Sequence, residues 1–378
     1  MSPNMKTLGM AMVTFLILCS RSFYPSAFAA SGSPDLLKIK QESESKGYVF
    51  LTNRDEIVSK AKKEGKLHTA LALEGSLKIT AEAFKKRFPF IDLQVQNLRV
   101  IEDSQKALLQ VKAGAAKDWD IVKTTPAFYH EWLPHLWKVD LLRMAENRVI
   151  DISPRMIDPK NRNVVALGSR LAVVAYNKNL VSPGQVPKTW EDMLRPEFKG
   201  RKFASDIHPS EIAGLVPAWS LEKTLDYARR IAAQEPIWTR GSSRSIMAIT
   251  TGEIPILLFG ASYSIAMRAQ LKDPLNAVQF TLLEPVPVRY TLEQGILSTS
   301  RNPHAALLWL EFMAGLEAQK LIDEHEPLVA SLYSKGSAAE QALKGKKLSI
   351  VSWENNEEME KWIEKLTGAY GLPQPDSK

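Results

Sequence analysis

The stretch from Leu167 to Gly200 constrains the fold of this chain more than any other. It begins with a run of small apolar residues over 171–175, rich in valine, which is typical of a short strand buried on both faces. The strand pattern stops abruptly, because the dipeptide Pro183-Gly184 breaks regular structure. A helix start follows, where Thr189 and Asp192 have capping-box spacing. The sequence therefore predicts a buried strand that leaves one folded body and a helix that opens another.

The same stretch resembles a segment of bacterial extracytoplasmic solute-binding proteins. The resemblance rests on residues 175–178 (AYNK), 186–194 (VPKTWEDML) and 198–200 (FKG), in this fixed order. In that family the segment lies where the chain crosses from the first lobe into the second. Further matches extend the resemblance over most of residues 53–330. The family includes iron(III)-binding and other small-solute-binding proteins with the type II two-lobe fold.

The first 29 residues have the pattern of a cleavable signal peptide. Lys6 gives a basic start, residues 8–18 form an uncharged apolar core, and 27–29 (AFA) has the small-x-small form that signal peptidase recognises. The apolar core is too short to anchor the chain across a bilayer. Leu18 is not the small residue that lipoprotein processing needs before Cys19. We therefore expect cleavage after residue 29 and export to the periplasm.

Composition limits the classes of function. Cleavage would remove Cys19, the one cysteine, so the mature chain has no thiol for a disulfide, a zinc cluster or a nucleophile. About 350 residues remain, which is enough for two lobes of ordinary size. The net charge of +7 is mild, and no basic run is interleaved with aromatic residues. We therefore expect a soluble monomer whose partners do not include nucleic acid.

Helical and strand patterns alternate along the chain. Residues 30–47, rich in Ser, Gly, Lys and Glu, are expected to form a flexible arm without a core of its own. From Asn53 onward helices and strands alternate, and one long helical region is expected over 210–233. This alternation predicts an α/β fold with mixed sheets flanked by helices and a ligand site at the carboxyl ends of the strands. The resemblance implies the two-lobe, type II architecture of periplasmic binding proteins, hinged around a central cleft.

Two segments are predicted to cross between the lobes. The first lies near 170–177, and the second lies near 282–288, where prolines interrupt a strand pattern. The predicted division gives a signal peptide, an arm and two discontinuous lobes: 1–29, 30–47, 48–169 plus 289–330 for the first lobe, and 170–288 plus 331–378 for the second.

Motifs for catalysis or metal binding are missing from the sequence. It contains no GxSxG elbow, P-loop or GxGxxG fingerprint, so we predict neither enzymatic activity nor a cofactor. Iron(III)-binding relatives usually place two adjacent tyrosines near the position of 259–264, whereas here Tyr263 stands alone. No metal site is predicted, because no close metal-binding pair or HExxH motif occurs among the six histidines: His68, His130, His135, His208, His304 and His325.

Candidate ligand-binding residues from the first lobe are hydroxyl residues at strand ends. Ser76, Thr124 and Thr125 precede predicted helix starts, where unpaired amides and the helix dipole favour an anion.

The second lobe supplies the remaining candidates. Asp206 would receive an amine, Ser242 and Ser243 would contribute a helix start, and Tyr263 would close the wall. Arg240 or Arg244 would supply the countercharge, since a guanidinium can grip a carboxylate or phosphonate with two parallel hydrogen bonds. Arg240 is the preferred candidate, because it precedes Gly241 on the loop.

Together these features predict a periplasmic substrate-binding protein that captures a small anion or zwitterion between its lobes. It would deliver this ligand to an ABC transporter permease in the inner membrane. Three alternatives stay open: a ferric-ion-binding importer component, a ligand-sensing subunit of a signalling receptor, and an exported hydrolase.

Overall fold

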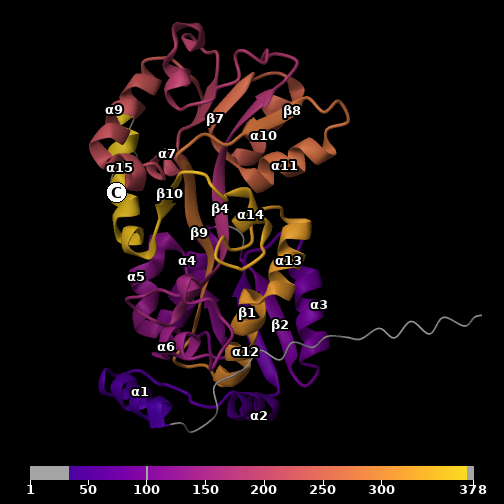
Figure 1. Ribbon diagram of the computed structural model, residues 1–378, viewed down its shortest axis with the longest axis vertical. Coiled ribbons are helices and arrows are strands. Elements are labelled where there is room, and N and C mark those ends of the chain that lie inside the picture. The colour runs from indigo at the N-terminus through magenta and orange to yellow at the C-terminus, as the bar shows by residue number, and fades with distance from the viewer. Residues whose placement is uncertain (1–33, 99–100, 373–378) are drawn as a thin grey trace, which may run out of the picture.

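The computed structural model describes residues 34–98 and 101–372, which form two α/β lobes joined by long strands (Figure 1). The expected signal peptide lies outside these residues. The sheet is mixed, with the strand order β2-β1-β3-β9-β4-β7-β5-β6, and β10 pairs with β9 and β8 with β4. The strands are β1 Lys66–Leu71, β2 Asp92–Asn97, β3 Ile121–Lys123, β4 Val164–Asn177, β5 Ala204–Asp206, β6 Ile237–Thr239, β7 Ile256–Ser262, β8 Val278–Thr281, β9 Val286–Ile296 and β10 Leu348–Val351.

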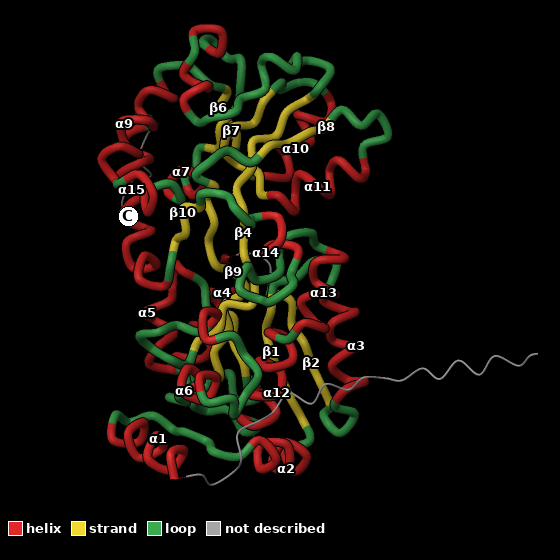
Figure 2. The backbone as a smooth tube through the Cα atoms, viewed as in Figure 1, coloured by secondary structure: helices red, strands yellow, loops and turns green. Residues whose placement is uncertain are grey.

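The helices lie around the strands of both lobes (Figure 2). They are α1 Pro34–Ser45, α2 Arg54–Glu64, α3 Leu77–Arg87, α4 Ile101–Lys112, α5 Tyr129–Trp132, α6 Leu141–Glu146, α7 Ser210–Ala213, α8 Val216–Trp219, α9 Leu221–Ala232, α10 Ser242–Thr251, α11 Tyr263–Lys272, α12 Pro303–Ala314, α13 Leu316–His325, α14 Ala338–Ala342 and α15 Asn356–Ala369. The mixed sheet flanked by helices confirms the predicted fold class.

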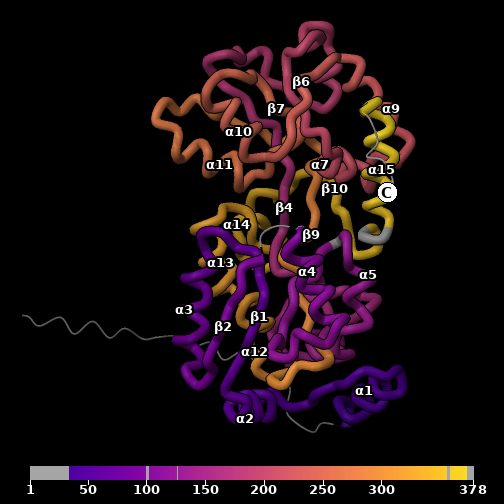
Figure 3. Tube along the Cα trace, turned by 180° about the vertical axis from the view of Figure 1, so that it is seen from behind, coloured from indigo at the N-terminus to yellow at the C-terminus, as the bar shows by residue number. Residues whose placement is uncertain are grey.

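Strands β4 and β9 join the two lobes, and both the front and back views show them running between the upper and lower halves (Figure 3). They pair antiparallel from Val164 opposite Gly295 to Leu171 opposite Val288. Beyond Leu171, β4 continues into the second lobe and pairs with β7 and β8. The predicted strand over 171–175 is therefore part of a longer one. The predicted residue boundaries of the two lobes stay a prediction.

Each lobe has a hydrophobic core of its own. In the first lobe the ring of Phe84 packs edge-on against that of Trp309, with centroids 5.1 Å apart. In the second, the rings of Trp190 and Phe259 stack with centroids 5.2 Å apart. Helix α15 adds Trp362 and other apolar residues to the second core and packs on α9. The C-terminal helix thus belongs to the packing of the second core.

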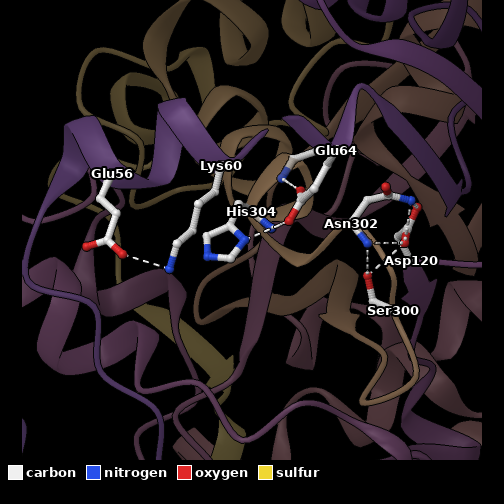
Figure 4. Close-up of polar contacts among 8 residues, drawn as sticks. Glu56, Lys60, Glu64, Asp120, Ser300, Asn302 and His304 are labelled. Carbon is white, nitrogen blue, oxygen red and sulfur yellow. Dashed lines mark hydrogen bonds and ion pairs between the residues drawn. The ribbon is translucent and has the colours of Figure 1, made fainter. Parts of the chain in front are cut away.

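A carboxylate holds the start of α12 (Figure 4). Pro303 occupies the first turn, where its fixed φ and missing N–H are favourable. The Glu64 carboxylate, at the end of α2, accepts hydrogen bonds from the backbone amides of His304 and Ala305 at 3.2 and 2.7 Å. The imidazole Nδ1 of His304 lies 2.6 Å from the same carboxylate. This histidine therefore has a structural partner.

Residues 34–45 differ from the prediction of a flexible arm, because they form helix α1. Leu36 is buried in the first-lobe core, with Ile39 packed against that core. The hydroxyl of Ser43 donates a hydrogen bond to the Asp140 carboxylate at 2.7 Å. The polar composition concealed two apolar residues with helical spacing, and these supply the face that docks.

Two helix predictions also need correction. Thr189 and Asp192 do form the reciprocal capping contacts, at 3.0 and 3.2 Å, but the turn that follows is a four-residue 3-10 helix over Glu191–Leu194. The region 210–233 is three helices, α7, α8 and α9, because Gly214 ends the first and Ser220, with a φ of 85°, separates the last two.

Candidate functional site

A cavity of about 310 Å³ lies where β4 and β9 pass between the lobes. Its walls come from the loop after β1, the end of β3, both crossing strands, the start of α11 and residues 326–329. The polar lining has seven charged side chains and several hydroxyls: Glu74, Lys123, Arg170, Arg268, Arg289, Glu293 and Glu326, with Thr125, Ser169, Ser262, Ser264 and Thr291.

Arg170 and Arg289 face each other across the paired strands, since they are direct partners in the β4–β9 ladder. Like charges directly opposite each other on antiparallel strands repel and destabilise the pair. Burial and, to a smaller degree, the neighbouring Arg170 guanidinium lower the pKa of Arg289 from its usual value. Such an arrangement becomes favourable when an anion lies between the two guanidinium groups.

The carboxylate of Glu211 neutralises part of the positive charge of these two arginines. The Arg170 Nη2 atom lies 3.0 Å from the Oε1 atom of Glu211, at the start of α7. Burial acts to raise the pKa of Glu211, but the guanidinium groups of Arg170 and Arg289 outweigh it and hold that pKa below its ordinary value. Glu211 is therefore ionised, and one negative charge serves two positive ones. Arg289 forms no salt bridge with the described residues.

Glu293, on β9, is a second buried charged group of the cavity whose interactions within the protein are incomplete. Its side chain is 3% exposed, and its Oε1 atom has no hydrogen-bond partner among the described residues. Burial raises the pKa of Glu293 to about 7, with Arg289 and Lys123 acting in the opposite direction. The ammonium group of Lys123 is directed to the carbonyl oxygen of Leu98, at 3.0 Å. A buried carboxylate oxygen without a donor is costly unless something outside the chain completes it.

Hydroxyl groups add to the unused hydrogen-bonding capacity of the cavity. The Oγ1 atom of Thr125 and the Oγ atom of Ser264 are buried and have no partner among the described residues. The Nε atom of Arg170 is in the same condition. Since buried polar atoms in native proteins are nearly always paired, this lining suits a polar ligand.

The structure places Ser76 against a protein carboxylate. The Oε1 atom of Glu326 accepts hydrogen bonds from the amides of Glu74, Gly75 and Ser76, at 3.0, 3.2 and 3.1 Å, and from the Ser76 hydroxyl at 2.6 Å. The amides at the start of α3, predicted to bind the ligand, are thus occupied by an internal anion. The sequence around Ser76 gives no indication of this contact, because Glu326 is 250 residues away.

The two threonines after β3 differ in position. Thr125 lines the cavity as predicted. Thr124 is fully buried beside it, and its backbone amide donates to the Glu293 carbonyl oxygen at 3.0 Å. The next element is a 3-10 turn over Pro126–Phe128, so the expected α-helix start is not found here.

The predicted second-lobe residues do not line this cavity. The Asp206 carboxylate accepts hydrogen bonds from the amides of His208 and Gly241 at 2.8 and 2.9 Å, and so ties two loops together. Arg240 lines a separate groove between β6 and α10, together with Arg244. Ser242 and Ser243 open α10 without making a side-chain cap.

Tyr263 was predicted to close the wall of the site, but its neighbours Ser262 and Ser264 line the cavity instead. The ring of Tyr263 packs edge-on against Phe280, with centroids 4.8 Å apart. Burial raises the pKa of its phenol above the ordinary value. This tyrosine therefore serves as a packing residue at the start of α11.

Charged residues on the crossing strands are the part of the site that sequence reasoning missed. Arg170 interrupts the apolar run of β4, and Arg289 and Glu293 interrupt that of β9. Charged residues are almost never placed in buried strands without a partner or a role. That anomaly was the signal that could have found them.

A larger hollow of about 830 Å³ lies elsewhere, on the first lobe. Residues 145–154, 314–316 and 333–336 supply its lining. The cavity at the crossing strands is the stronger candidate site, because it combines residues of both lobes with unpaired buried polar groups.

Two α/β lobes, joined by crossing strands around a cavity with unsatisfied polar groups, define a binding protein of the two-lobe periplasmic type. The chain belongs to the bacterial extracellular solute-binding protein family, whose model matches residues 145–358. This finding confirms the predicted family.

Among curated proteins, the chain is similar to the Fe(3+)-binding periplasmic protein of Serratia marcescens. The two are 21% identical over 170 residues, which are 43% of this chain and 50% of the relative. The match thus spans about half the length of that relative.

Solved structures share the fold over most of the chain. Iron-bound HitA from Pseudomonas aeruginosa has a TM-score of 0.60 at 18% identity, covering 81% of this chain and 99% of its own. The spermidine/putrescine-binding protein PotD from Streptococcus pneumoniae has a TM-score of 0.57 at 14% identity, with 81% and 99% covered. These similarities confirm the two-lobe fold.

Proposed function

We propose that this protein captures a small solute carrying an anionic group in the cavity between its lobes and delivers it to an ABC permease in the inner membrane. It would act in the periplasm as a monomer, without enzymatic activity. Closure of the lobes around the solute would create the form that the permease recognises.

The observation that carries this proposal is the direct opposition of Arg170 and Arg289 in the cavity. Glu211 neutralises one of the two positive charges, and Lys123 and Arg268 add further cations to the lining. Arginine pairs that face each other suit bidentate recognition of a carboxylate or phosphonate. The unpaired hydroxyls of Thr125 and Ser264 can complete the hydrogen bonding of its oxygens.

Ferric ion is the alternative, favoured by what the Serratia relative is named for. The cavity lining disfavours it. Four of its seven charged side chains are cationic, and two of its three carboxylates are already held inside the protein, Glu74 by Arg268 and Glu326 by backbone amides. Across the described residues, no three His, Cys, Asp or Glu side chains come together as a metal site. Tyr263, the residue at the position of the iron-binding tyrosines, packs on Phe280.

A sensor that passes its liganded form to a signalling receptor would use the same cavity. Identification of the protein that co-purifies with the liganded form separates the two, since transport requires a permease. An exported hydrolase would need turnover, which a panel of ester, phosphate and glycoside substrates measures directly.

Thermal-shift screening of the purified protein against carboxylates, phosphonates, amino acids, sugars, polyamines and ferric citrate tests the proposal, followed by titration calorimetry of the hits. We expect anionic compounds to raise the melting temperature. The variant Arg289→Lys, which keeps the charge but loses the two-pronged geometry, should weaken binding about tenfold, and Arg289→Met about a hundredfold.

Arg240→Met is the matched control, because Arg240 lines a separate groove. It should bind like the wild type. Stabilisation by ferric citrate, sugars or polyamines alone, or equal losses in the Arg240 and Arg289 variants, would contradict the proposed function.

A further inference from the structure

Several charged groups of the cavity lining have partners inside the protein. Arg268 pairs with Glu74, Arg170 pairs with Glu211, and Glu326 is held by the amides at the start of α3. Three charged groups of the lining are left without such a partner: Arg289, Lys123 and Glu293.

These groups have opposite signs and lie along one wall. Arg289 and Glu293 are four residues apart on β9, and both side chains line the cavity. Lys123 lies on β3, where it is the ladder partner of Gln294, the residue next to Glu293 on β9. The wall therefore offers a cationic end at Arg289 and a buried acceptor toward the other end.

We propose that Glu293 recognises a positively charged hydrogen-bond donor on the solute, so that the ligand is a zwitterion with its acid group at Arg289 and its ammonium group at Glu293. This inference rests on the proposed function, and it narrows the anionic solute to one that also carries an amine.

Lys123 is the protein cation that could pair with Glu293 in place of a ligand, so the direction of its ammonium group matters. Its ammonium nitrogen is 3.0 Å from the Leu98 carbonyl oxygen, and it forms no salt bridge with the described residues. Burial lowers the pKa of Lys123, and the nearby carboxylates of Glu293 and Asp103 act in the opposite direction. The Oε1 atom of Glu293 consequently keeps a free acceptor position for the ligand.

Charge balance narrows the ligand further. With Arg289 and Lys123 positive and Glu293 negative, the unpaired set has one excess positive charge. A ligand with one ammonium group and two negative charges balances it. Acidic amino acids and aminoalkylphosphonates have this charge pattern, and molecules of their size suit a cavity of about 310 Å³.

Matched pairs of probes isolate the role of the amine. L-glutamate and glutarate differ by the ammonium group, as do 3-aminopropylphosphonate and propylphosphonate. For at least one pair, titration calorimetry on the wild type should give affinity about tenfold higher for the amine-bearing member, because an ion pair completes the buried Glu293. The variant Glu293→Gln should lose that preference and bind the amine-free member at least as well as the wild type.

A proton readout separates ligand contact from a structural role. Because burial holds the pKa of Glu293 near 7, an ammonium group at this carboxylate should release a proton when binding occurs at pH 6.5. Calorimetry in buffers of different ionisation enthalpy measures that release. The amine-free probes should release none by this route.

Glu253→Gln is the control, since Glu253 is exposed in the groove that contains Arg240. Equal affinities within both pairs, or a Glu293→Gln variant that weakens both members alike, would overturn the role of Glu293 and leave the proposed function standing. If no probe binds and the full anion panel also fails, the proposed function fails with it.

Discussion

Arg268 of α11 forms an ion pair with Glu74, three residues after the end of β1, and so connects the second lobe to the first across the cavity. The side chains are 28% and 47% exposed, so solvent screens the pair and its contribution to unfolding free energy is ~0–1 kcal/mol. Its position gives it another consequence, because the contact exists only while the lobes are this close.

The variants Arg268→Ala and Glu74→Gln should therefore shift the protein toward an open form. We expect nearly unchanged stability and up to about fivefold faster ligand dissociation in stopped-flow measurements. Arg230→Ala is the control, since its partner Asp226 lies on the same helix, α9. If Arg268→Ala leaves the dissociation rate unchanged and Glu74→Gln alone raises it, the ion pair is not what holds the lobes.

Glu326 is predicted to stabilise the loop before α3. Its carboxylate accepts four hydrogen bonds from residues 74–76. Glu326→Gln removes the charge that these amides and the helix dipole favour, and should lower the free energy of unfolding by about 1–3 kcal/mol. Urea denaturation measures this loss. Glu324→Gln, at an exposed neighbouring position, should be silent, and equal effects of the two variants would refute the assignment.

Local signals predicted most of the fold. Helix α2 begins after Asn53, whose side chain accepts from the amides of Asp55 and Glu56, and ends at Gly65 in the left-handed region with a φ of 67°. Both ends could be predicted because the capping residues are adjacent to the helix they terminate. The prediction of one long helical region over 210–233 was wrong. One of its breaks lies at Ser220, and serine is not a residue type that marks the end of a helix in the sequence.

The site depended on contacts that the sequence does not display. Arg170 and Arg289 are opposite each other only because β4 and β9 pair, and the register of that pairing is a property of the whole fold. Ser76 had the right local chemistry for an anion, yet Glu326 arrives from a distant segment and occupies it. Thr125 could be found because it follows the end of β3 by two residues, beside the cavity.

Gly168 is predicted to tolerate no larger residue. A Cβ atom at this position would lie 2.7 Å from the Val329 carbonyl oxygen and 2.8 Å from the Leu292 side chain. Gly168→Ala should therefore push residues 328–330 away from β4 and cost about 1–3 kcal/mol of unfolding free energy. Gly184→Ala, with nothing within 4 Å of the added carbon, is the control in the same denaturation experiment. Equal stability of both variants would show that the strand junction is loosely packed.

The pH dependence of stability should reveal Glu293 in the ligand-free protein. The pKa of this carboxyl group is about 7 when folded and 4.5 when exposed. Between these values the native state keeps a proton that the unfolded state has lost, so this group makes stability fall as pH rises from 4.5 to 7. The total loss is about 3 kcal/mol, since each pKa unit corresponds to ~1.4 kcal/mol.

Glu293→Gln has no such titration. It should match the wild type near pH 5 and exceed its unfolding free energy by up to about 3 kcal/mol at pH 8. Chemical denaturation at a series of pH values measures the difference, in which the other titrating groups cancel. Glu253→Gln, at an exposed position, should follow the wild type throughout. Wild-type and Glu293→Gln curves that stay parallel from pH 5 to 8 would mean that the carboxyl group titrates normally and that its burial carries no cost for a ligand to relieve.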